Sequence, residues 1–191
     1  LLCELGRYRE ALQALLPKLP ALYGSNHERA AILAVHAHNR LKEHEAACRL
    51  ATAALARHPG SDDLHASLGC ALFNSHQYGR GLEEVRRAIA LNPQYADHHY
   101  VEASMLATLN RHEAAEAAVL RALERSPNEA RFHCLLGDCL LALGAPDEAR
   151  EAALRGLALA PTDADLLGLQ ARLVDGRARK VDLLQAALRS D

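Results

Sequence analysis

Apolar residues recur along the whole chain with the spacing of an α-helix, and no stretch sustains the two-residue alternation of a β-strand. Ala and Leu, both strong helix formers, dominate the helical stretches. Gly and Pro fall at regular points between these stretches, where they interrupt helices. The pattern therefore predicts an all-α fold.

Four prolines, Pro59, Pro93, Pro127 and Pro161, follow one another at a constant interval. Each one follows two helical stretches, at a point where a helix cannot continue. The predicted helix pairs are 28–41 with 44–57, 62–74 with 78–91, 96–109 with 112–125, and 130–143 with 146–159. Pairs that repeat in this way predict an α-solenoid of antiparallel helix pairs.

The chain outside the four pairs carries its own breaking signals. Pro17 and Pro20 are expected to end a first helix, since a proline inside a helix loses a hydrogen bond and clashes with the preceding turn. Residues 24–26 are expected to be a linker, with Asn26 as the N-cap of the next helix. Gly144 is expected to end the helix before it.

Small residues recur in the same register. They precede the four prolines by twelve residues at Ala47, Gly81, Ala115 and Ala149, and by five residues at Ala54, Ala88, Ala122 and Gly156. Two helices approach closely only where small side chains meet, because a larger one would overpack the contact. Gly69 and Gly137 lie inside predicted first helices, where a close crossing would offset the cost of glycine.

The helix–turn–helix unit of about 34 residues, with its small residues and closing proline, resembles the tetratricopeptide repeat. Residues 68–72 and 136–140 look like the signature of that family's first helix, and Tyr8 and Tyr78 match its aromatic residue at the start of the second helix. The resemblance implies a right-handed superhelix that forms a single domain over residues 1–191. The expected segments are a half repeat at 1–24, full repeats at 28–61, 62–95, 96–129 and 130–163, and a degenerate repeat with a capping helix at 164–191. We interpret the chain as a fragment of a longer protein because it begins within this pattern at Leu1.

The same resemblance implies a binding surface, since the first helices of successive repeats line the concave face in this family. The predicted groove residues are Ile32, Leu33, His36, Arg40, Cys70, Phe73, Asn74, Tyr100, Val101, Ser104, Arg131, Leu135 and Asp138. They are mostly apolar or small, so we expect a protein or peptide partner that inserts an apolar segment, either extended or helical. Tyr100 and Phe73 are the expected anchors. The alternative is that these residues pack against neighbouring parts of the protein itself.

A different mode of recognition in the family, a clamp for a peptide's terminal carboxylate, is not expected. The positions that would carry its Lys, Asn and Arg residues hold Ile32, His36 and Ser67.

Histidine and cysteine offer two further hypotheses. His65, His99 and His133 recur at the interval of the prolines, which suggests either a metal-binding or pH-sensing ladder or a ring that fills the family's usual aromatic position. We favour the second interpretation, because equivalent positions on successive repeats lie roughly 10 Å apart and zinc ligands bind at about 2 Å. The five cysteines have no metal-binding spacing and are expected to be reduced and buried. No metal and no cofactor are expected.

Composition narrows the functional class. The net charge of −2 and the lack of a basic run argue against nucleic acid, and no apolar run is long enough for membrane insertion. No catalytic motif is found, so we do not expect an enzyme. Reduced cysteines favour the cytoplasm, and the Ala, Leu and Arg usage suggests a bacterial source.

The leading hypothesis is therefore a protein–protein interaction scaffold. Two alternatives stay open. One is a self-association module that gives a homo-oligomer, and the other is a regulatory or docking domain of an enzyme whose catalytic part lies outside this chain.

Overall fold

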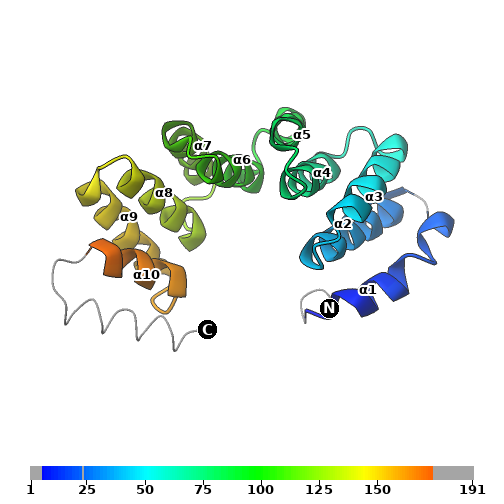
Figure 1. The fold of residues 1–191 in the computed structure, drawn as a ribbon, viewed down its shortest axis with the longest axis horizontal. Coiled ribbons are helices and arrows are strands. Elements are labelled where there is room, and N and C mark those ends of the chain that lie inside the picture. Colours follow the sequence, from blue (N-terminus) through cyan, green and yellow to red (C-terminus); the bar gives the residue numbers. More distant parts are fainter. Residues whose placement is uncertain (1–5, 23, 174–191) are drawn as a thin grey trace. The chain divides into compact units, whose positions relative to one another are not determined.

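The computed structural model describes residues 6–22 and 24–173, and the structural statements below concern these residues (Figure 1). They form ten α-helices and one 3₁₀ helix, and no strand is found among them. The all-α prediction is confirmed. None of the described helices combines the length and the apolar character needed to cross a membrane.

The helices follow the predicted register closely. Their bounds are α1 Tyr8–Leu15, η1 Leu19–Ala21, α2 Gly24–Arg40, α3 His44–Arg57, α4 Asp62–Asn74, α5 Tyr78–Leu91, α6 Ala96–Thr108, α7 His112–Arg125, α8 Ala130–Ala142, α9 Pro146–Leu159 and α10 Ala164–Leu173. Every predicted second helix has the observed bounds, and so does the first helix at 62–74. The predicted helices 96–109 and 130–143 each end one residue early.

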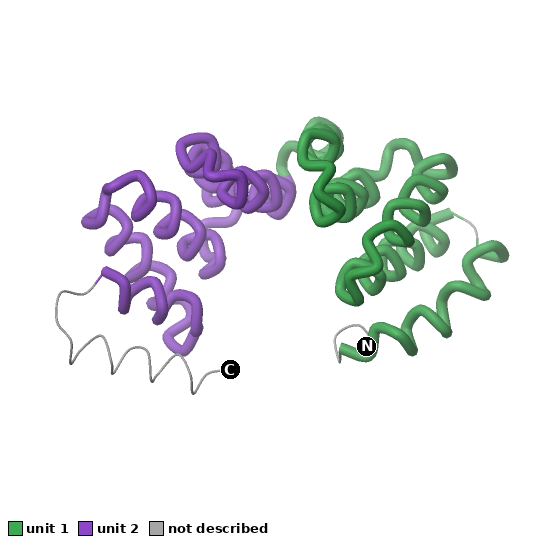
Figure 2. The backbone as a smooth tube through the Cα atoms, viewed as in Figure 1, with its two compact units in different colours: residues 1–94 green, residues 95–191 purple. Residues whose placement is uncertain are grey.

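The chain divides into two compact units, residues 1–94 and 95–191 (Figure 2). In unit 1, α2 packs against α1, α3 and α4, and α4 pairs with α5. In unit 2, α6 pairs with α7, α8 pairs with α9, and α8 also contacts α6 and α10. The prediction of a single domain stays a prediction.

The predicted linker at residues 24–26 is wrong, because α2 already begins at Gly24. The reversal is made earlier, where α1 ends at Leu15 before Pro17 and where Pro20 lies in the short helix η1. Gly24 has a φ of +54°, which a glycine adopts without steric cost. The early start adds a turn to α2 that carries the buried His27.

The first helices α2, α4, α6 and α8 all end in the same way. The residue after the helix C-cap lies in the left-handed region, with φ between 57° and 78°, at Lys42, His76, Asn110 and Gly144. The next N–H then bonds back to the helix, as in Arg111 N to Leu106 O at 2.9 Å and Ala145 N to Leu140 O at 2.9 Å. This is the Schellman motif, which satisfies carbonyls left free at a helix C-terminus. Gly144 was predicted to end its helix, but the other three positions carry side chains and gave no such signal.

The small residues lie where helices cross. Ala47, Ala115 and Ala149 are fully buried, and so are the small residues closer to the prolines at Ala88 and Ala122. The tightest crossing joins α4 and α5, where a Cβ on Gly69 would lie 2.8 Å from the carbonyl oxygen of Gly81. The predicted close crossing is confirmed at this pair.

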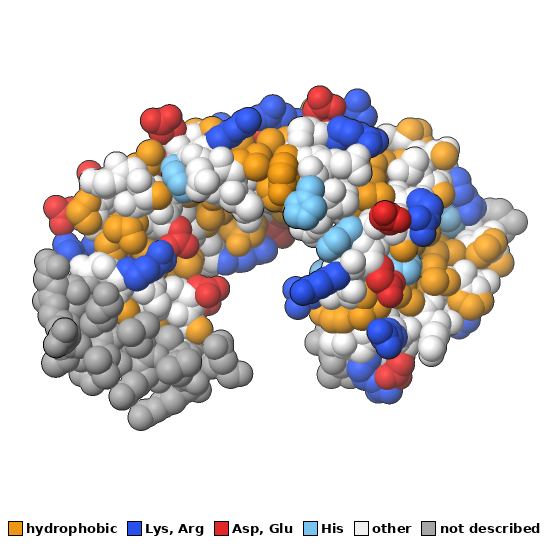
Figure 3. All heavy atoms as spheres, viewed as in Figure 1, with side chains coloured by type: hydrophobic (Ala, Val, Ile, Leu, Met, Phe, Trp, Pro, Cys, Tyr) orange, Lys and Arg blue, Asp and Glu red, His pale blue; other side chains and the backbone are white. Residues whose placement is uncertain are grey.

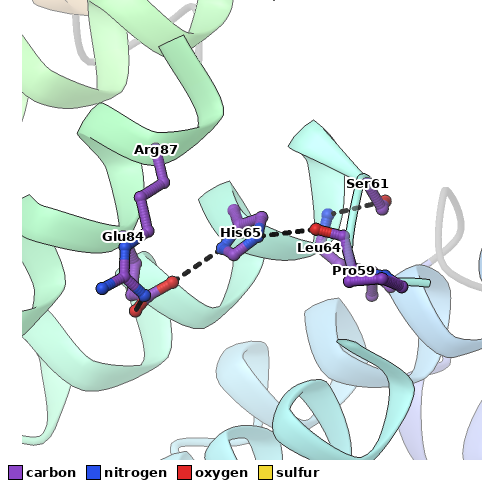
Figure 4. A network of polar contacts seen from close by, with 6 residues as sticks. All are labelled: Pro59, Ser61, Leu64, His65, Glu84 and Arg87. Carbon is purple, nitrogen blue, oxygen red and sulfur yellow. Dashed lines mark hydrogen bonds and ion pairs between the residues drawn. The ribbon is translucent and has the colours of Figure 1, made fainter. Parts of the chain in front are cut away.

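Two of the three repeated histidines, His65 and His133, contact the turns that carry the prolines, and Figure 4 shows the contacts of His65. His65 Nε2 lies 3.2 Å from the carbonyl oxygen of Pro59, and His133 Nε2 lies 2.9 Å from that of Pro127. His65 Nδ1 lies 2.7 Å from Oε2 of Glu84, whose other oxygen accepts from Arg87. Each ring therefore ties a first helix to the turn before it, which is a packing role.

The ends of the chain are described only in part. Helix α10 begins the further repeat that was predicted from residue 164, and the expected capping helix after residue 173 lies outside the described residues. Residues 1–5 of the expected half repeat also lie outside them. Helix α1 packs on α2 through Leu12, which is buried with Ala30 and Ala34.

A Gly69→Ala substitution tests the crossing. The added Cβ would lie 2.6 Å from Cγ2 of Val85, so α4 and α5 must separate, at a cost of about 1–3 kcal/mol in the free energy of unfolding. Urea unfolding followed by circular dichroism measures the loss. The matched control is Gly79→Ala in α5, whose Cβ would meet no described atom within 4 Å. We expect it to be neutral or to stabilise by up to about 1 kcal/mol, and equal effects for the two variants would contradict the crossing.

Acid is expected to weaken unit 1 through His27. Burial is the main cause that lowers the pKa of His27, with Arg57 and His58 adding to it, and its Nδ1 lies 2.9 Å from Nε2 of His58. The unfolded chain therefore takes up the proton more readily, so the stability is full above about pH 6.5 and is lost as the pH falls through the folded value. Urea unfolding at about pH 7.5 and about pH 5.5 measures the loss, and His27→Gln should reduce it. A His27→Gln variant that keeps the full loss of stability in acid would contradict this role of His27.

Candidate functional site

The predicted groove residues of unit 1 lie on α2 and α4, which contact each other. Leu33, His36, Arg40 and Asn74 are exposed, while Ile32 and Cys70 are half-buried. Phe73 is buried, and its ring meets that of Tyr78 edge to face at 4.9 Å. It therefore packs within the helix pair and offers little surface to a partner.

Part of this surface is covered by the chain itself. The ring of Tyr8 from α1 lies 6.1 Å from that of His36, and the guanidinium of Arg40 lies 5.7 Å from the Tyr8 ring centre. Although His36 is exposed overall, partial desolvation of its ring lowers its pKa, and the nearby Arg40 lowers it further. The nearest hollow, of about 510 Å³, includes only Arg40 and Asn74 from the predicted set. This hollow therefore brings together two of the seven predicted residues of unit 1.

Unit 2 brings several of the predicted residues together. Tyr100, Arg131, Leu135 and Asp138 line one cavity of about 300 Å³, together with Cys134, Asp163, Asp165 and Arg172. We call this cavity, defined by these eight residues, the α8 pocket. Val101 and Ser104, the other two predicted residues of unit 2, are half-buried on α6 and do not line it.

Aromatic and cationic groups form one wall of the α8 pocket. The rings of Tyr100 and Phe132 stack at 5.0 Å with an interplanar angle of 26°. The guanidinium of Arg131 lies 5.1 Å from the centre of the Tyr100 ring, a cation–π distance. Arg131 also donates to Asp97 at 2.5 Å. These contacts fix the Tyr100 ring, so it presents a rigid surface to the pocket.

Both arginines of the pocket are paired within the protein. Arg131 bonds Asp97, and Arg172 bonds Asp138. Each pair joins two first helices at positions 34 residues apart, which the repeat places side by side. The sequence carried this signal, because opposite charges stand one repeat apart, but Arg172 was not among the predicted site residues.

Two carboxylates of the pocket, those of Asp163 and Asp165, form no ion pair with any of residues 6–22 and 24–173, although Arg131 and Arg172 line the same cavity. Asp163 accepts from the backbone N–H of Leu166 at 2.9 Å and so caps the start of α10. Asp165 lies in the first turn of α10 and is exposed. With both arginines paired, these two groups give the pocket an excess of negative charge.

The thiol of Cys134 lies among these charges. Burial, followed by the charges of Asp138, Asp165 and Asp163, raises the pKa of its thiol to about 12, against the opposing effect of Arg172. A protonated thiol is a weak nucleophile, so Cys134 is poorly suited to nucleophilic chemistry. Cys48, Cys70, Cys134 and Cys139 are free, and Cys3 lies outside the described residues.

Figure 3 shows hydrophobic side chains among scattered acidic and basic ones over each unit, on the face that it draws. The described residues form no extended surface of a single charge on that face.

The sequence profile of the tetratricopeptide repeat matches residues 66–130 and 108–164, which together span just over half of the chain. The chain belongs to the tetratricopeptide repeat family. No curated protein matches it significantly in sequence.

Solved structures of the family show the same fold. A thermophilic TPR protein of Thermus thermophilus is 23% identical with a TM-score of 0.76, and the match covers 96% of this chain and 94% of that one. PilF of Pseudomonas aeruginosa is 21% identical with a TM-score of 0.78, and the match covers 85% of this chain and 76% of PilF. YrrB, a TPR protein with an unusual peptide-binding site, is 19% identical with a TM-score of 0.63, and 85% of each chain is covered.

Cys134 should resist alkylation. At about pH 8 a thiol with a pKa of about 12 has roughly 10⁻⁴ of its population as thiolate, against about 10⁻¹ or more for an ordinary cysteine. We expect iodoacetamide to modify Cys134 at least about 100-fold more slowly in the folded protein than in urea, as measured by peptide mass spectrometry. A folded-state rate equal to that in urea would show that the pocket does not hold the thiol protonated.

Proposed function

We propose that this chain is a protein-interaction scaffold that holds a segment of a partner protein in the α8 pocket. One observation carries the proposal. Four groove residues predicted from the repeat register, on α6 and α8, line a single cavity that α10 completes. A binding site assembled from successive first helices is what the family's architecture offers.

The size and composition of the pocket support a peptide-like ligand. A volume of about 300 Å³ is at the low end for ligand sites, about 300–1,000 Å³, and suits one long side chain with the backbone beside it. Tyr100 and Leu135 are half-buried and can each bury further apolar surface. Fully burying an apolar side chain contributes about 1.5–3 kcal/mol. The peptide-binding site of YrrB, in a protein of the same fold, is consistent with the proposal.

A second candidate function is self-association through the second helices of unit 2. Leu120 in α7 and Leu154 in α9 are 42% and 51% exposed, although both are large and apolar. They stand one repeat apart and so occupy equivalent positions of successive repeats. A second copy of the chain could cover such a surface.

A pair of substitutions in the pocket tests the leading proposal. The probe is a phage-displayed library of random dodecapeptides, whose selected sequences are synthesised and measured by fluorescence polarisation. The charge-balanced variant Tyr100→Lys/Leu135→Glu removes two apolar contacts, so we expect binding to weaken at least about 100-fold, the loss typical of interface hot spots. Circular dichroism should show unchanged helicity.

The matched control is Leu120→Glu/Leu154→Lys, which makes the same kind of change on α7 and α9. It should leave peptide affinity unchanged. Sedimentation of the wild-type chain and of this control decides the second candidate, since a concentration-dependent dimer that the control dissociates would support self-association. Selected peptides that bind the pocket variant as tightly as the wild type would contradict the leading proposal, and so would a selection that yields no binding peptide.

A further inference from the structure

Taking the proposed function as its basis, we propose that the α8 pocket recognises a lysine or arginine side chain of the bound segment. The cationic head would lie beside Asp163 and Asp165, and the apolar stem would lie along Tyr100 and Leu135. All four residues line the same cavity. The proposal concerns which segment is chosen and goes beyond the statement that a segment is bound.

Some charged groups of the pocket already form ion pairs within the protein, and others do not. Asp138 is neutralised by Arg172, and Arg131 is neutralised by Asp97. Asp163 uses one carboxylate oxygen, Oδ1, to cap α10, and it forms no ion pair with a described residue. Asp165 makes no ion pair with a described residue either. A cation that enters therefore meets two carboxylates and breaks no existing ion pair.

An anionic ligand meets the opposite situation. It would have to take Arg131 from Asp97, at 2.5 Å, or Arg172 from Asp138. Each exchange leaves a carboxylate without its partner in a partly buried site, and such a loss is costly. The N-terminus of α10 does favour negative charge, but Asp163 already caps it and Asp165 already lies in its first turn. The pocket is therefore selective for cations.

The shape of the wall supports a long side chain with an apolar stem. Lysine and arginine cover apolar surface with their methylene groups while the charged head stays in a polar environment. Leu135 and the Tyr100 ring supply that apolar surface, and the ring is already fixed by stacking on Phe132. Burial raises the pKa of the Cys134 thiol in this wall, and the charges of Asp138, Asp165 and Asp163 raise it further against the opposing effect of Arg172.

The test is a double-mutant cycle between protein and peptide. The protein variant is Asp163→Asn/Asp165→Asn, which removes two charges while asparagine retains the capping ability of residue 163. The selected dodecapeptide is made in four versions, with Lys, norleucine, Gln or Glu at the most strongly selected basic position. With the wild type we expect Lys to bind about 5- to 20-fold more tightly than norleucine, and this preference should fall below about twofold with the variant.

The matched protein control is Glu113→Gln/Glu148→Gln, which removes two exposed acidic charges from the first turns of α7 and α9. It should keep the full preference for Lys. Raising the salt concentration from about 50 to about 500 mM should lower the affinity for the Lys peptide, because salt screens charge pairs. The affinity for the norleucine peptide should not change.

The other outcomes separate this inference from the proposed function. Peptides that bind in the pocket without a basic residue, or with a Lys preference that survives Asp163→Asn/Asp165→Asn, would overturn the inference and leave the function intact. Selection of acidic peptides would also overturn it, because such peptides would pair with Arg131 and Arg172. A synthetic peptide of residues 174–191, with Arg177, Arg179 and Lys180, serves as a competitor. If it binds more tightly than every selected peptide and needs both aspartates, the occupant is this chain's own segment, which overturns the assignment to a partner.

Discussion

The close approach of paired helices is the constraint on which the rest of each unit depends. In α4 and α5 the backbone of Gly69 meets that of Gly81 so closely that neither position has room for a Cβ. Similarly close contacts in unit 2 place Gly137 against Leu169 and Gly156 against Leu166. The small residues of each pair lie in this contact between helices. Other faces of α6, α8 and α10 are therefore left to line a pocket.

The constant length of the repeat turns sequence distance into spatial proximity. A left-handed residue closes each of the first helices α2, α4, α6 and α8, and at two repeats a histidine binds the carbonyl of the proline turn before it. These devices keep successive repeats at the same length. Within unit 2, residues one repeat apart on first helices therefore lie side by side, and the ion pairs Asp97–Arg131 and Asp138–Arg172 are the consequence.

Much of the fold was predictable because period, proline and glycine act locally. The linker at residues 24–26 was mispredicted because η1 had already reversed the chain, which no single residue reveals. The pocket was predicted only in part. Asp163 and Asp165 look like ordinary capping residues in the sequence, and only the packing of α10 against α8 brings them to the cavity. Phe73 has the composition of an anchor, but Tyr78 buries it within the pair.

Affinity and selectivity have different physical sources in such a pocket. Apolar surface from Tyr100 and Leu135 attracts any hydrophobic segment, because burial is non-directional. Charge discriminates between segments, since a wrong sign must break existing pairs or leave a charge unbalanced. The two arginines of the pocket are paired within the protein, and in our proposal Asp163 and Asp165 therefore carry the recognition of charge. The position of the pocket thus follows from the repeat. In our proposal the sign of the charge that it prefers follows from Asp163 and Asp165, which do not belong to the repeat's packing pattern.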